Sequence, residues 1–251
     1  MADTSPVRVL VWDEAPRHAP KEVYPASING AVAEGLRRLG GSGLTVRTSN
    51  LDDAEQGCPA DLLNATDVVV WWGHARHGEV TDQTAARVVA RVVSGGMGFV
   101  ALHSAHYSKP FQRILNAPGH LKGGWRELNP MESEEIRVCA PWHPIAKDVT
   151  DFTIPHEEMY GAPFDVPPPL VTVLQSRFPY DGKTFPSGLC WTVGEGKDPA
   201  FTSGPGGGVG EGLGKARVFY FRPGHETVPT YFSETVQRIV TNAVLWCAHR
   251  S

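Results

Sequence analysis

One stretch decides the fold of this chain: Asp67-Val68-Val69-Val70-Trp71-Trp72-Gly73-His74-Ala75-Arg76-His77. A second stretch repeats its plan: Met97-Gly98-Phe99-Val100-Ala101-Leu102-His103-Ser104-Ala105-His106. Each is a short apolar run, which predicts a buried strand, followed by a His-x-x-His pair. Parallel strands release their chains at one edge of a sheet, where ligands bind. We therefore expect up to four imidazoles to share a small volume.

Strand and helix signals alternate through the first hundred residues. Helix-spaced apolar positions and a following glycine pair predict two helices, Ala26–Leu39 and Thr81–Val93. Between and around them, β-branched runs predict four strands, Val7–Trp12, Leu44–Thr48, Val68–Trp72 and Phe99–Leu102. This alternation is typical of a parallel α/β sheet flanked by helices. Adjacent strand side chains point to opposite faces, so Trp71 and Trp72 should pack on different sides of the sheet.

Proline and glycine become frequent after Pro110, and the strand signals weaken. The predicted strands there are Glu135–Cys139, Phe152–Ile154, Leu170–Gln175, Leu189–Val193 and a stronger Ala216–Phe221. Gly204–Gly214 is predicted as a flexible loop at a hairpin tip, and Phe232–Cys247 as a closing amphipathic helix. We expect a single domain over residues 1–251, elaborated at about 110–215 by edge strands added to the same sheet.

Composition excludes several classes of function. A net charge of -4 without a basic patch argues against a nucleic-acid partner. No apolar stretch reaches transmembrane length, and the start lacks a secretory signal, so we expect no membrane partner. The cysteines are scattered without a Cys-x-x-Cys pair, at positions Cys58, Cys139, Cys190 and Cys247. That pattern favours a reducing compartment, and we expect a cytoplasmic protein.

The histidine pairs admit two interpretations. Imidazole is the commonest ligand of divalent transition metals, and His225, after the last predicted strand, joins the pairs if that strand is a parallel neighbour. The site would then hold a metal such as zinc. In the other interpretation the pocket is metal-free, and its histidines bind substrate or transfer protons.

Two further segments bear polar groups suited to such a pocket. In His156-Glu157-Glu158-Met159-Tyr160 only one of the two carboxylates should face it, because neighbouring strand residues point to opposite faces. Trp125 and Arg126 suit a polyhydroxylated ligand, since an indole packs on sugar C–H groups while a guanidinium donates to hydroxyls. A purely structural role for that tryptophan is an equal alternative.

The turn at His103-Ser104 lies where α/β hydrolases carry a nucleophile elbow. The glycines of a Gly-x-Ser-x-Gly motif are absent around Ser104, and no cysteine lies there. Serine or cysteine nucleophilic chemistry is therefore disfavoured.

Taken together, the motifs resemble the ThuA-like family, named for trehalose utilisation, over nearly the whole chain. They are Trp71–His77, Leu102–His106, Trp125–Glu127, His143–Ile145, His156–Gly161 and Phe219–Glu226. The resemblance implies a fold similar to class I glutamine amidotransferases, a flavodoxin-like three-layer sandwich with a mostly parallel central sheet. It does not imply amidotransferase chemistry, because His103 and Ser104 stand where those enzymes have a cysteine.

The resemblance also implies site roles. The family's shared positions map onto His103, onto Glu158 with Tyr160, and onto Gly224-His225. His74, His77 and His106 belong to a longer subgroup motif. The family's association with disaccharide and keto-sugar catabolism suggests a carbohydrate ligand.

We therefore expect a metal-assisted hydrolase, lyase or isomerase of sugars. Its catalytic residues would be His103, Glu158 and His225, with Trp125, Arg126, Tyr160 and Arg222 binding substrate. The expected zinc ligands are His74, His77 and His106, joined by His103 or His225. The alternative is a non-catalytic sugar-binding or regulatory protein with the same pocket. The sequence leaves open whether the chain forms a homo-oligomer.

Overall fold

A nine-stranded sheet organises the chain, in the order β2-β1-β3-β4-β11-β10-β9-β6-β7. The computed structural model describes residues 5–194 and 216–250. The predicted loop Gly204–Gly214 lies outside these residues. The strands of the sheet are β1 Val7–Asp13, β2 Leu44–Asn50, β3 Val68–Trp72, β4 Gly98–Leu102, β6 Glu132–Val138, β7 Phe152–Glu157, β9 Val171–Arg177, β10 Thr184–Val193 and β11 Ala216–Phe221.

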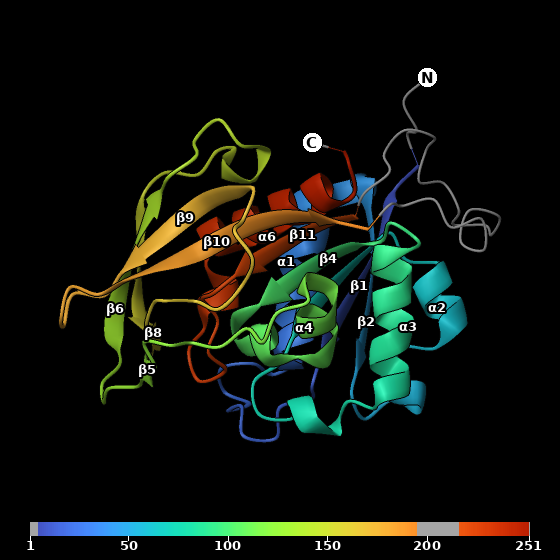
Figure 1. Ribbon diagram of the computed structural model, residues 1–251, viewed down its shortest axis with the longest axis horizontal. Coiled ribbons are helices and arrows are strands. Elements are labelled where there is room, and N and C mark those ends of the chain that lie inside the picture. The colour runs from blue at the N-terminus through green and yellow to red at the C-terminus, as the bar shows by residue number, and fades with distance from the viewer. Residues whose placement is uncertain (1–4, 195–215, 251) are drawn as a thin grey trace.

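The first half of the sheet is parallel, as predicted. Strands β2, β1, β3, β4 and β11 pair side by side in the same direction. Their helices are α1 Ser27–Gly40, α2 Ala60–Asn64, α3 Asp82–Val93, α4 Lys109–Leu115 and α6 Glu234–Cys247. Figure 1 shows α3 and α4 on one face of the sheet, with α1 and α6 together on the other. The predicted α/β sandwich of three layers is confirmed.

The second half is antiparallel and extends the same sheet. Strand β10 pairs with both β11 and β9, and β6 joins β9 to β7 (Figure 1). The predicted edge strands do extend the same sheet, and they pair antiparallel. Two-residue strands β5 Trp125–Arg126 and β8 Met159–Tyr160 form a separate antiparallel pair. These, like α2, are too short to show a period in the sequence.

Two apolar clusters fill the spaces between the layers and confirm the alternation expected in β3. Trp71 is fully buried on the side of α3 and stacks on Trp12, with ring centroids 3.7 Å apart. Trp72 is buried on the side of α1 and α6. Its indole Nε1 donates to the carbonyl of Gly224 at 3.0 Å, which ties β3 to the loop after β11. Within residues 5–194 and 216–250, no helix combines the length and apolarity needed to cross a bilayer.

Candidate functional site

Three neighbouring parallel strands end in histidines that meet above the sheet. His74 follows β3, His103 follows β4, and His225 follows β11. The ring centroids of His74 lie 5.1 Å from those of both His103 and His225, and the other two rings are 5.5 Å apart. Glu158, which follows β7, completes the group with Oε2 3.6 Å from His103 Nε2. We call these four residues the imidazole pocket.

His103 occupies the elbow between β4 and the following 3-10 turn. Its φ of 55° is in the left-handed region, which costs a side-chain-bearing residue energy. The side chain is fully buried. Backbone strain at the end of a central strand is the geometry that presents a nucleophile in elbow enzymes. Here the same geometry presents an imidazole.

Hydrogen bonding determines which ring nitrogens carry protons. His103 Nδ1 lies 3.2 Å from the carbonyl oxygen of Arg222, which can only accept, so Nδ1 carries the hydrogen. In a neutral ring, Nε2 is then an acceptor, and His74 Nδ1 donates to it at 2.9 Å. The unprotonated nitrogen of His74 is consequently Nε2.

His225 has the opposite polarity. The backbone N–H of Thr227 donates to its Nδ1 at 3.3 Å, so Nε2 carries the hydrogen. Nε2 lies 3.7 Å from a carboxylate oxygen of Glu226. His225 therefore offers the pocket a donor, whereas His74 offers a lone pair.

The two adjacent carboxylates have separate tasks. Glu157 accepts hydrogen bonds from the backbone N–H groups of Gly224 and His225, at 2.7 and 3.2 Å, and from the Thr230 hydroxyl at 3.0 Å. It braces the loop after β11. Gly224 itself, at φ 128°, has no space for a Cβ, which would lie 2.0 Å from the Tyr231 hydroxyl. Glu158 is the carboxylate in the imidazole pocket, and its Oε2 is buried without a hydrogen-bond partner in the described chain.

Burial reverses the usual protonation pattern of the pocket. Desolvation raises the pKa of Glu158 to about 8. It lowers the pKa of His74 and of His225 to about 4 each, and holds the pKa of His103 well below its usual value. A protonated carboxyl group therefore lies beside neutral imidazoles near pH 7. Such divergent environments separate a proton donor from proton acceptors.

A buried ion pair supports the pocket from below. Arg222 is fully buried, and its Nε donates to Glu134 Oε1 at 3.0 Å while Nη2 pairs with the other oxygen. Its Nη1 donates to the backbone carbonyl of Glu158. The structure thus places Arg222, expected to bind substrate, underneath Glu158, where it positions that residue.

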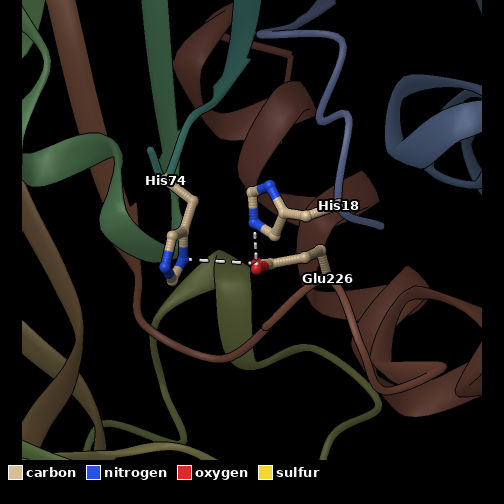
Figure 2. A group of neighbouring side chains, drawn as sticks. All are labelled: His18, His74 and Glu226. Atoms are coloured by element: carbon tan, nitrogen blue, oxygen red, sulfur yellow. Dashed lines mark hydrogen bonds and ion pairs between the residues drawn. The ribbon is translucent and has the colours of Figure 1, made fainter. Parts of the chain in front are cut away.

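A second group lies at the mouth of the pocket. Glu226 is buried, and His18, from the loop after β1, places Nε2 2.5 Å from its Oε1. His74 Nδ1 lies 3.2 Å from its Oε2 (Figure 2). Glu14, also buried, accepts from the backbone N–H groups of residues 74–76 at 2.7–2.9 Å. Glu14 therefore sets the position of His74.

Two sets of side chains have donor atoms close enough to hold a metal ion, among the residues that the structure describes. They are His18, His74 and Glu226, and His74, His103 and Glu158. His77 and His106, expected as ligands beside His74, lie in neither set. His106 donates from Nδ1 to the Gly119 carbonyl at 2.7 Å and packs among aromatic rings. Each pair thus sends its first histidine into the pocket.

The side chains expected to bind sugar differ in their burial and in the partners that they already have. Tyr160 is buried, with its hydroxyl 3.4 Å from His103 Nε2 and bonded to Ser104. Arg126 is held by Glu132 and Asp181, so its guanidinium is occupied. Trp125 is 64% exposed. An open groove of about 470 Å³ adjoins the pocket at Thr227, whose hydroxyl lies 2.8 Å from His225 Nδ1. The groove is also lined by Glu127–Met131, His156 and Val228.

Sequence reasoning gave no role to His18, Glu14, Glu134 or Glu226. Glu14 had a visible signal, because Asp13-Glu14 ends the first strand at the same edge as the histidines. Glu226 directly follows His225 in a recognised motif. His18 had no such signal, because it lies on a loop whose sequence has no hydrophobic periodicity.

Comparisons with known proteins agree with this architecture. The sequence model of the ThuA family, described as trehalose utilisation, matches residues 8–247. A ThuA-like protein from Bacteroides uniformis shares 16% identity at a TM-score of 0.60, covering 98% of this chain and 93% of that one. A ThuA-like protein from Parabacteroides merdae shares 16% identity at a TM-score of 0.61, covering 97% of this chain and 90% of that one.

A third similar structure is a glutamine amidotransferase from Thermotoga maritima. It shares 10% identity at a TM-score of 0.50, with 96% of this chain and 98% of that one covered. No curated protein matches the sequence. At these identities the structural likenesses establish the fold alone.

Proposed function

The chain belongs to the ThuA family, described as trehalose utilisation, and on that premise we propose that it is an enzyme acting on a disaccharide or a keto-sugar in the imidazole pocket. The role in carbohydrate metabolism comes from the family. The pocket and its chemistry are the assignment made here from residues 74, 103, 158 and 225.

The convergence of a carboxyl group and an imidazole carries the proposal. Glu158 Oε2 and His103 Nε2 lie 3.6 Å apart, both buried, at the carboxyl edge of the sheet. Glu158 Oε2 finds no hydrogen-bond partner among residues 5–194 and 216–250, which is costly unless a ligand supplies one. A sugar oxygen that accepts the Glu158 proton would satisfy it. The raised pKa of Glu158 agrees with this role of general acid.

The remaining groups divide the binding tasks. The His225 Nε2–H can donate to a sugar hydroxyl or carbonyl, and the lone pair of His74 Nε2 can accept. The groove beside Thr227 has the size range of small-molecule sites, about 300–1,000 Å³. Exposed Trp125, on β5, offers an apolar face for sugar C–H groups. These features support a carbohydrate ligand.

A divalent cation, zinc as expected from the sequence, is part of the proposal. Both candidate sets contain His74 and combine imidazole nitrogens with one carboxylate, which are ligands that zinc uses. When bound, the ion would polarise a sugar oxygen or activate water. Amidotransferase chemistry is not proposed, because His103 stands at the elbow.

The expected location and partners remain part of the proposal. All four cysteines are free, and three are buried, which suits the reducing cytoplasm. Small carbohydrates, and neither nucleic acid nor membrane, are the proposed ligands. A homo-oligomer is compatible with the proposal, which does not depend on it.

Turnover of a panel of glycosides and 3-keto-glycosides, with and without Zn²⁺, tests the proposal. We expect Glu158→Gln to reduce kcat/KM for the accepted substrate by about 10²–10⁴-fold. The matched control is Glu135→Gln, which changes an exposed carboxylate on β6 and should leave turnover unchanged. Sugar binding without turnover of any panel member would instead identify a non-catalytic sugar-binding protein.

A further inference from the structure

His18 adds a ligand that lies outside the imidazole pocket. It belongs to the loop between β1 and α1, which Tyr24 ties to the loop after β11 by donating to the Val228 carbonyl at 2.7 Å. Figure 2 shows His18 and His74 approaching the carboxylate of Glu226 from two directions. The three residues come from segments after β1, β3 and β11, so only the folded chain brings them together.

The inner set is poorly arranged for a metal ion. His103 has one lone pair, at Nε2, because its Nδ1–H points to the Arg222 carbonyl. That lone pair already accepts from His74 Nδ1 at 2.9 Å. Either set would break this hydrogen bond at His74 Nδ1, but only the inner set also needs the fully buried His103 as a ligand.

His74 faces the outer set with Nδ1, which lies 3.2 Å from Glu226 Oε2. This nitrogen also carries the hydrogen that His74 donates to His103, so an ion bound at Nδ1 would displace that hydrogen and leave the ring N–H on Nε2. The His74 backbone is held by Glu14, which accepts from the N–H of residue 74 at 2.8 Å. His74 is thus an oriented ligand before any ion arrives.

Glu226 provides the charge. Its carboxylate is almost fully buried, and Oε2 makes no hydrogen bond within the described part of the chain. Buried carboxylates of Glu14 and Glu157 lie in the same region, while Arg222 is engaged by Glu134. A buried carboxylate with one oxygen left without a hydrogen bond is costly, and a divalent cation would offset that cost.

The exposure of the outer set leaves one side open to solvent. The side chains of His18, His74 and Glu226 are 46%, 23% and 2% exposed. A catalytic zinc site has three protein ligands and one open position. We propose that His18, His74 and Glu226 form a site for a divalent transition-metal cation of the zinc class, with His103 and Glu158 remaining a metal-free proton-transfer pair. This assignment extends the proposed function, and the role of the ion in turnover rests on that proposed function.

Zinc binding to the untagged full chain, stripped of metal, tests the assignment without any turnover. Competition with a chromophoric chelator gives the Kd, and elemental analysis gives the stoichiometry. We expect one Zn²⁺ per chain. His18→Gln and Glu226→Gln should each weaken binding by more than about a hundredfold, since even residues behind a ligand cost 10–100-fold. The accessible His18 makes its variant the one least expected to disturb folding, and its Tm is measured in parallel.

Two controls separate the alternatives. Glu158→Gln, in the inner set, and His120→Gln, an exposed histidine outside both sets, should keep the Kd within about threefold of the parent value. Loss of zinc in Glu158→Gln with retention in His18→Gln would overturn the assignment in favour of the inner set. Absence of stoichiometric zinc in the parent chain would overturn it altogether. Either result leaves the turnover test of Glu158 informative, so the two proposals can fail separately.

Discussion

The parallel and antiparallel halves of the sheet contribute opposite chemistry to the imidazole pocket. The parallel half ends in imidazoles, His74, His103 and His225, which burial keeps neutral. The antiparallel half contributes carboxylates, Glu134 on β6 and Glu158 after β7. The site forms where the last parallel strand, β11, meets the first antiparallel one, β10.

The difference reflects how each half is supported. Parallel strands end at a common edge, where Glu14 and Glu157 hold the turns that carry His74 and His225 through backbone hydrogen bonds. In the antiparallel half, the buried Arg222–Glu134 ion pair holds Glu158 at that edge, because Arg222 also donates to the Glu158 carbonyl. We therefore expect changes in the first half to alter chemistry mainly, and changes in the second half to alter stability as well.

The largest expected effect comes from removing one proton-transfer group from each half. His103→Asn and Glu158→Gln should each lower kcat/KM by about 10²–10⁴-fold. Because the two groups act on one proton path, the double variant should lose little more than the worse single variant, as catalytic residues that act as a unit do. Losses that multiply in the double variant would show that the halves act independently.

The next effect concerns the buried Arg222–Glu134 ion pair, which supports the antiparallel half. Arg222→Met leaves Glu134 buried without its partner, and should lower the free energy of unfolding by about 3–5 kcal/mol. Adding Glu134→Leu should restore part of that loss, because no charge is then left unpaired. Urea unfolding provides the measurement. Arg177→Met, which breaks an exposed pair with Glu135, is the control and should cost at most about 1 kcal/mol.

The smallest effect is an acid sensitivity of the antiparallel half. Arg126 holds the pKa of Asp181 well below its ordinary value of 3.8. A carboxylate with a lowered folded-state pKa stabilises the fold above its ordinary pKa, and this stabilisation is lost as the pH falls through the folded-state value. Unfolding free energies at about pH 5 and about pH 2 should therefore differ less in Asp181→Asn than in the parent chain. An equal acid response in both would contradict this role of Asp181.

Prediction from the sequence succeeded where local pattern and architecture coincide. The apolar run Val68–Trp72 has the bounds of β3, and the parallel neighbourhood of β4 and β11 placed His103 and His225 at one edge. The antiparallel strands were located but not their order in the sheet. Sequence patterns define the face of a strand, whereas the partner of a strand depends on distant segments.

Roles within the His-x-x-His pairs show the same division. Spacing alone treats His74 and His77 as equals, and likewise His103 and His106. The folded chain separates them, because the turns after β3 and β4 direct only the first histidine of each pair toward Glu158 and Glu226. No local signal marks His18, which enters the site through the path of its loop.

The sequence by itself determined the sheet, its parallel strands and the edge at which imidazoles gather, because strand periodicity and parallel connection are local properties of the chain. Only the tertiary structure decided which groups carry protons and which could hold a cation. Those properties follow from the carbonyl of Arg222 that orients His103, the hydrogen bond that His74 donates to His103, and the burial of Glu158 and Glu226. Each depends on contacts between residues far apart in sequence, which no spacing records.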